Sequence, residues 1–99
     1  MAGARIRLLL ADDHTLLRQG LRALLEKEAD IRIVAEAQDG REVVRKAIAL
    51  KPDVVLMDIS MPRFTGIEAT EKIRTELPMT QVVALSMHDG DEQVEAVLH

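Results

Sequence analysis

Four short, mostly apolar runs recur along the chain. The longer stretches between them mix apolar and polar residues with a different period. The runs are rich in leucine or β-branched residues, are bounded by polar or turn residues, and cover residues 6–11, 31–35, 54–57 and 82–85. Short continuous apolar runs with such boundaries are typical of buried strands. We therefore predict four strands at these positions.

Between the runs, apolar residues recur every three or four positions, which is the period of an amphipathic helix. The pattern predicts helices around Leu17, Leu21 and Leu24, around Val43 and Ala47, and over residues 66–77. A further helix is predicted to begin near residues 89–91, because Val94, Val97 and Leu98 are spaced at i, i+3 and i+4.

Alternating strands and helices predict an α/β fold with a doubly wound parallel sheet, of the flavodoxin-like type. The second strand carries Arg32 and Glu36 among its apolar residues, which suits an edge, whereas the first and third are almost wholly apolar, which suits the centre. We expect strand order 2-1-3-4. At the observed spacing a fifth parallel strand would begin near residue ~106, since its crossover needs a dozen or more residues. Strand 5 and helix 5 are therefore expected to be missing.

Composition limits the function classes. A chain of 99 residues holds one domain, over residues 1–99, and the absence of cysteine excludes a disulfide framework and a thiolate zinc site. A net charge of -4 and a single aromatic residue, Phe64, argue against direct nucleic acid binding. No apolar run approaches the roughly 20 residues of a membrane span, and the N-terminus lacks a signal-peptide core. We expect a cytoplasmic chain that does not contact a membrane.

Acidic residues follow two of the predicted central strands. Asp12 and Asp13 come directly after the first apolar run, and Asp58 comes after the third. In an open parallel sheet, ligands bind outside the carboxyl ends of the strands at the point where the strand order reverses. Three carboxylates meeting there would repel one another unless a cation lay among them. Mg²⁺ suits such a site, because it takes oxygen ligands, water and phosphate.

A carboxylate beside Mg²⁺ can itself accept a phosphoryl group, and Asp58 is the candidate. The loop that follows it can turn a main-chain carbonyl back onto the metal, and we assign that carbonyl to Ser60. Ser86, at the end of the fourth strand, would present its hydroxyl to a phosphoryl oxygen.

Other interpretations of these residues exist. Asp12 and Asp13 could cap the helix that begins near Leu16, and Ser86 could be an ordinary strand-end residue. His14 has no second histidine or cysteine at zinc-ligand spacing, so a solvated loop residue is the better interpretation. A phosphohydrolase of the haloacid dehalogenase class would need a second aspartate where Ser60 stands, and a flavodoxin-type cofactor domain would need a phosphate-binding loop after the first strand.

Four motifs in this order resemble the receiver domain of bacterial response regulators. They are Asp12-Asp13-His14 and the segments 55–62 (VLMDISMP), 66–69 (GIEA) and 85–88 (LSMH). The resemblance covers essentially the whole chain and is strongest to the NarL/FixJ class, whose members usually carry a LuxR-type helix-turn-helix output domain.

The resemblance implies a role for each matching residue. Asp58 would be the phosphoacceptor, Asp13 a direct Mg²⁺ ligand and Asp12 an acidic partner acting directly or through water. The Ser60 carbonyl would be a further metal ligand, and Ser86 the switch hydroxyl. A sensor histidine kinase would be the partner that donates the phosphoryl group, and a DNA-binding output in a longer parent protein would respond. The resemblance implies that such a chain would be a phosphoacceptor and not an enzyme, with self-phosphorylation and autodephosphorylation at most.

The chain departs from the family pattern after its fourth predicted strand. Receivers carry a lysine at the end of strand 5, a switch aromatic residue on that strand and a fifth helix, and we expect none of them within this chain. Lys51 and Lys72 lie where neither can replace that lysine. The alternative function is a truncated, non-switching receiver that self-associates through the exposed edge of its fourth strand, residues 82–85, or through its last helix.

Overall fold

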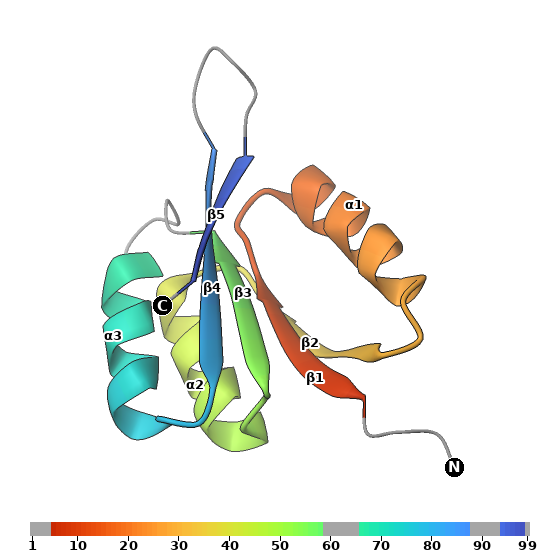
Figure 1. Cartoon of the computed structure of the whole chain (residues 1–99). Helices are drawn as coiled ribbons and strands as arrows, with labels where there is room; N and C mark the ends of the chain where they lie inside the picture. The colour runs from red at the N-terminus through yellow and green to blue at the C-terminus, as the bar shows by residue number, and fades with distance from the viewer. Residues whose placement is uncertain (1–4, 59–65, 88–93, 99) are drawn as a thin grey trace.

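The computed structural model describes residues 5–58, 66–87 and 94–98, and folds them as strands and helices in alternation (Figure 1). The elements are β1 (Ile6–Ala11), α1 (Thr15–Glu26), β2 (Ile31–Ala37), α2 (Gly40–Leu50), β3 (Val54–Asp58), α3 (Gly66–Glu76), β4 (Gln81–Met87) and β5 (Val94–Leu98). The four predicted strands and the first three predicted helices are all present.

The sheet has the order β2-β1-β3-β4-β5. β1, β2, β3 and β4 run parallel, so the predicted order 2-1-3-4 is confirmed, with β2 at an edge. Leu8 is paired with Val54, and Asp58 with Leu85. This register brings the carboxyl ends of β1 and β3 to the same edge of the sheet.

The predicted last helix is wrong, and so is the expectation of a sheet without a fifth strand. Residues 94–98 form β5, which runs antiparallel to β4. An antiparallel strand needs only a short connection, and the edge of β4 offers backbone groups that require partners. Val94 and Val97 are β-branched and suit a strand. Strand pairing therefore overrides the helical spacing, and β4 does not present the bare edge on which self-association was predicted.

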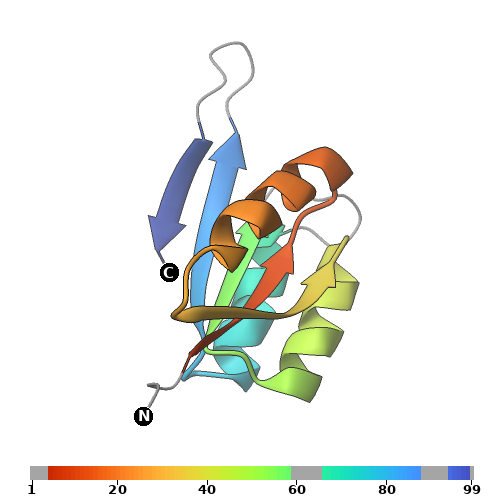
Figure 2. The same cartoon turned by 90° about the vertical axis from the view of Figure 1, so that its right-hand side faces the viewer.

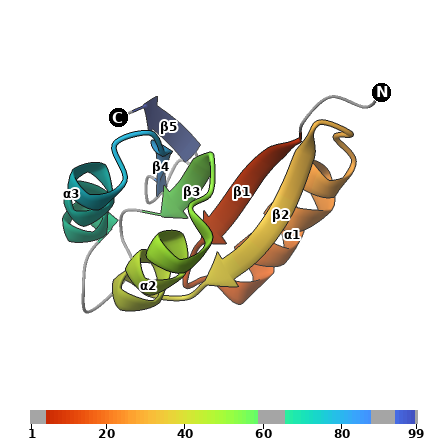
Figure 3. The same ribbon diagram turned by 90° about the horizontal axis from the view of Figure 1, so that it is seen from below.

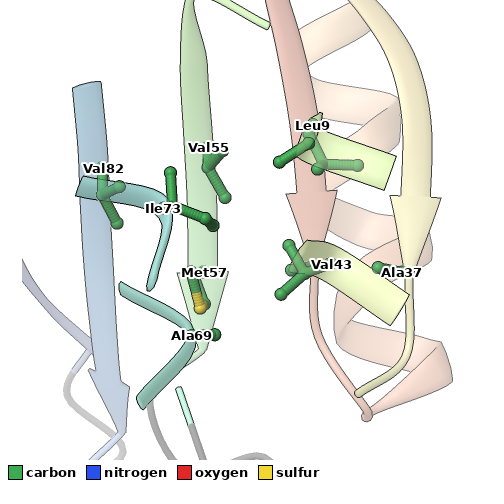
Figure 4. Close-up of a cluster of buried hydrophobic side chains, with 10 residues drawn as sticks. Leu9, Ala37, Val43, Val55, Met57, Ala69, Ile73 and Val82 are labelled. Atoms are coloured by element: carbon green, nitrogen blue, oxygen red, sulfur yellow. The ribbon is translucent and has the colours of Figure 1, made fainter. Parts of the chain in front are cut away.

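Helices cover the two faces of the sheet unequally. α2 and α3 pack side by side on one face, whereas α1 lies on the other, against β1 and β2 (Figure 3). The core fills the space between the sheet and the α2 and α3 pair, and its labelled side chains are Leu9, Ala37, Val43, Val55, Met57, Ala69, Ile73 and Val82 (Figure 4).

α2 has clear start and stop signals. The Asp39 carboxylate accepts a hydrogen bond from the Glu42 N–H at 2.8 Å, and the Glu42 carboxylate accepts one from the Gln38 N–H at 2.7 Å. This reciprocal capping satisfies backbone donors that have no partner within the helix. The helix ends at Leu50, and the capping residue Lys51 takes a left-handed conformation with φ of 48° before Pro52. α1 has no comparable cap, since the side chain of its first flanking residue, His14, makes no capping hydrogen bond.

Candidate functional site

Three carboxylates and one imidazole meet at the carboxyl edge of the sheet. Asp12 and Asp13 leave the end of β1, Asp58 ends β3, and His14 precedes α1, which starts at this edge and runs back along the sheet (Figure 2). One ligand atom from each of the four residues lies within 4.8 Å of the others. Asp12 is 1% exposed and Asp58 is 5% exposed. The predicted convergence of the three aspartates is therefore present.

Asp12 is held through several of its polar groups. Its N–H donates to the Ala37 carbonyl of β2 at 3.0 Å, and its carbonyl accepts from Nη1 of Arg18 at 2.6 Å. Its Oδ1 accepts from the His14 N–H at 2.7 Å. These contacts leave Oδ2 as the Asp12 side-chain oxygen without a hydrogen-bond partner. The orientation of that oxygen is therefore imposed by the surrounding backbone.

Two buried side-chain oxygens of the cluster suit a cation. Among the described residues, Asp12 Oδ2 and Asp13 Oδ1 are the buried side-chain atoms with no hydrogen-bond partner, although Oδ1 of Asp13 lies near the His14 ring. A buried carboxylate oxygen without a donor is costly. Closely spaced carboxylate oxygens are the ligands preferred by hard divalent cations such as Mg²⁺. The residues present therefore fit a bound divalent cation.

His14 stands at the mouth of the cluster. Its Nδ1 lies 3.2 Å from an oxygen of Asp12, 3.0 Å from Asp13 and 3.4 Å from Asp58, while its side chain is 58% exposed. The negative charge of Asp13 raises the pKa of His14 above its ordinary value, and hydrogen bonding and charge from Asp12 and Asp58 act in the same direction. The imidazole is therefore an exposed residue, as predicted, but it also faces all three carboxylates.

Burial raises the pKa of Asp12, and the nearby charge of Asp58 adds to that rise. The hydrogen bond from the His14 N–H opposes it, because that bond favours the ionised form. A cation among these carboxylates would offset the same repulsion.

The remaining predicted site residues are only partly described. Ser60 lies outside the described residues. The backbone of Ser86 belongs to β4, directly after Leu85, which pairs with Asp58, but the Ser86 side chain lies outside the described part. Lys51 follows α2, and Lys72 on α3 faces Glu76 at 3.7 Å.

The capping interpretation of the two aspartates is not supported by α1. The helix begins at Thr15 with His14 as its first flanking residue, and Asp12 binds the N–H of His14 rather than an N–H inside the helix. Sequence reasoning missed Arg18 and Glu36, which contact each other and, through Arg18, the backbone of Asp12. Glu36 reaches this position only because β1 and β2 pair in parallel. The spacing of residues along α1 therefore gives no indication of its contact with Arg18.

No helix in the described ranges is both long and apolar enough to cross a membrane.

Comparison with known families gives a match to the response regulator receiver domain over residues 8–99. Among curated relatives, the transcriptional regulatory protein LiaR of Bacillus subtilis is 46% identical over 93 residues, which are 94% of this chain and 44% of LiaR. The transcriptional regulatory protein MctR of Rhizobium johnstonii is 46% identical over 99 residues, covering 96% of this chain and 45% of MctR. The chain thus spans less than half the length of these relatives.

Solved structures show the same fold. The signal receiver domain of the response regulator NarL from Mycobacterium tuberculosis is 33% identical, with a TM-score of 0.82 over 90% of this chain and 72% of that one. The response regulator domain of Thermotoga maritima CheB is 41% identical, with a TM-score of 0.80 over 87% of this chain and 65% of that one. With its fold, its acidic cluster and these similarities in agreement, the chain belongs to the response regulator receiver domain family.

Proposed function

We propose that the chain accepts a phosphoryl group on Asp58 in a Mg²⁺-dependent reaction, with a sensor histidine kinase as the donor. The observation that carries this proposal is the placement of the Asp58 carboxylate, buried at the end of β3 and within 4.8 Å of ligand atoms from Asp12 and Asp13. The chain is then a phosphoacceptor rather than an enzyme in its own right.

The carboxylate of Asp58 acts as the nucleophile. One of its oxygens forms a bond to phosphorus, while the bond from phosphorus to the donor nitrogen breaks and the electron pair leaves with the donor imidazole. The product on Asp58 is an acyl phosphate. Mg²⁺, if held by Asp12, Asp13 and Asp58, would supply positive charge next to the phosphoryl oxygens.

The neighbouring residues prepare the site for this transfer. Asp12 and Asp13 would hold Mg²⁺ with Oδ2 and Oδ1, the buried oxygens that accept no hydrogen bond, and Asp58 would supply a further ligand. The Ser60 carbonyl is proposed as a fourth protein ligand. Ser86 is proposed as the switch hydroxyl that binds the phosphoryl group, which agrees with its place on β4 next to the residue paired with Asp58.

Phosphorylation is tested by incubating the chain with acetyl phosphate and MgCl₂ and measuring its intact mass under acidic conditions that preserve acyl phosphates. We expect a gain of one phosphoryl group, which Asp58→Asn removes. Asp30→Asn is the matched control, because Asp30 is an exposed aspartate in the turn before β2 and should leave the gain unchanged. A mass gain that survives Asp58→Asn would place the acceptor elsewhere, and folded wild-type chain with no gain would contradict the proposal.

In a longer parent protein, phosphorylation would control a DNA-binding transcriptional output in the cytoplasm, a proposal supported by the names of LiaR and MctR as transcriptional regulatory proteins. The chain itself is not proposed to bind nucleic acid or a membrane. Self-association remains a prediction. Its original basis was a bare edge on β4, but β5 pairs along that edge. Light scattering over a range of protein concentrations measures it directly.

A further inference from the structure

We infer that Arg18 and Glu36 form a clamp that positions Asp12 within the metal site, so that the edge strand β2 helps to set the affinity for Mg²⁺. The inference rests on the proposed function, since it concerns the same cation. Arg18 is here a positioning residue, because it acts on the site through Asp12 and touches none of the carboxylate oxygens of the cluster in the contacts described.

One guanidinium joins two elements at once. Nη1 of Arg18 donates to the Asp12 carbonyl at 2.6 Å, and Nε donates to Oε1 of Glu36 at 2.9 Å. The fork of donors on arginine is planar and rigid, so one contact fixes the direction of the other. The Arg18 side chain is 12% exposed, and a charged group with so little contact with water is stable only when it is paired.

Glu36 is itself held in place, so it can serve as a fixed point for Arg18. Its second carboxylate oxygen accepts a hydrogen bond from Nη1 of Arg22, and its main-chain carbonyl accepts one from Nζ of Lys46 on α2 at 2.5 Å. The next residue, Ala37, accepts the hydrogen bond from the Asp12 N–H. The end of β2 therefore holds both the N–H and, through Arg18, the carbonyl of Asp12.

This arrangement acts on the metal site because the Asp12 carbonyl belongs to the peptide that joins Asp12 to Asp13. Without Arg18, that peptide would be free to rotate, and the carboxylate oxygens of Asp12 and Asp13 would change direction together. Groups that orient metal ligands from outside the coordination shell commonly change metal affinity by about 10-fold to 100-fold. The clamp should therefore be visible in Mg²⁺ binding itself, without any phosphoryl transfer.

The test compares Arg18→Met with Arg45→Met. Methionine keeps much of the apolar stem and removes every donor. Arg45 is the matched control, because it is an exposed arginine on α2 whose described contact is with Glu42 and not with Glu36 or Asp12. Calorimetric titration with MgCl₂ gives the dissociation constant, and the carbon-13 shift of the Asp12 carbonyl reports directly on the loss of its hydrogen bond.

We expect Arg18→Met to weaken Mg²⁺ binding about 10-fold and to shift the Asp12 carbonyl signal, whereas Arg45→Met changes the affinity by less than about 2-fold. Equal affinities for the two variants would overturn the clamp. If Arg18→Met does not fold, Arg18→Lys decides: a single ammonium cannot span Asp12 and Glu36 as a guanidinium does, so affinity should fall at least about 3-fold, and wild-type affinity would overturn the inference.

The wild-type chain separates this inference from the proposed function. If the wild type does not bind Mg²⁺, the proposed metal site fails and the clamp has nothing to position. If the wild type binds Mg²⁺ and the Arg18 variants bind it equally well, the clamp alone fails.

Discussion

The two faces of the sheet are built in different ways. On the face covered by α2 and α3, Val43, Ala47, Ala69 and Ile73 are all fully buried. On the opposite face α1 has no buried residue, and Leu16 and Leu24 are 82% and 62% exposed. On the α2 and α3 face both the helices and the sheet bury apolar side chains. On the α1 face Leu8 and Leu10 of β1 are buried, but α1 itself contributes no buried residue and contacts β2 through charged side chains.

This difference between the two faces affects the functional site. α1 begins at the acidic cluster, and its two arginines, Arg18 and Arg22, both contact Glu36 of β2. Apolar packing on the α2 and α3 face holds β1 and β3 in register, so it sets where the carboxylates are. The charged contacts on the α1 face then set the orientation of Asp12. Stability and site geometry should therefore respond to different substitutions.

The largest expected effect is on the packed face. Ile73→Ala removes a fully buried side chain from the core and leaves a cavity, so the free energy of unfolding should fall by about 3 kcal/mol. Urea unfolding followed by far-ultraviolet circular dichroism measures it, since the chain contains neither tryptophan nor tyrosine for fluorescence.

Leu16→Ala is the counterpart on the α1 face. The side chain is almost wholly in water, so the change in unfolding free energy should stay within about 0.5 kcal/mol. A loss of unfolding free energy close to that of Ile73→Ala would mean that the two faces are packed alike, and would contradict the difference between them.

A stabilising change is expected in the middle of α1. A Cβ added at Gly20 meets no atom within 4 Å apart from its chain neighbours and the backbone of its own helix, so alanine fits there. Alanine is favoured over glycine within a helix by about 0.8 kcal/mol, and Gly20→Ala should raise the free energy of unfolding by a similar amount. The exposed neighbour Gln19→Ala serves as a control for a substitution that does not remove a glycine, and equal effects of the two would count against this explanation.

The charged contacts of α1 should show a smaller, salt-dependent energy. A double-mutant cycle with Arg22→Met and Glu36→Gln should give a coupling energy of about 0.5 kcal/mol, because both side chains are partly exposed. The coupling should shrink in about 1 M NaCl, where charges are screened within roughly 3 Å. A coupling that is unaffected by salt would indicate a role in packing instead of charge.

The smallest expected effect concerns pH. Without metal, nuclear magnetic resonance should give a pKa for His14 above its ordinary 6.5, and Asp13→Asn should lower it, because Asp13 is the main cause of the rise. The protonated imidazole then stabilises the fold below pH 6.5, and this contribution is lost as the pH rises through the folded-state pKa. A His14 pKa that does not respond to Asp13→Asn would contradict this assignment of cause.

Local sequence patterns predicted an element correctly where its apolar content and its periodicity indicated the same structure. β1 was predicted to its ends because a run that is apolar except for Arg7 lies between Arg5 and Asp12, and the edge position of β2 followed from Arg32 and Glu36. The convergence of Asp12, Asp13 and Asp58 also followed, since parallel strands bring their carboxyl ends to one edge.

Residues 94–98 show where local pattern was insufficient. The spacing of Val94, Val97 and Leu98 fits a helix, but these residues form a strand because the edge of β4 supplies backbone partners. Helix and strand periods cannot be separated over so short a segment, and the deciding interaction comes from a strand that begins more than ten positions earlier in the sequence.

The sequence by itself determined the strand order of the parallel strands, the family and the carboxylates of the site, because apolar period and the order of motifs are local properties of the chain. Tertiary structure alone decided that β5 closes the β4 edge and that Arg18 and Glu36 brace Asp12. These contacts join residues whose proximity depends on how the strands pair and on where α1 lies against the sheet, and no spacing along the chain encodes that arrangement.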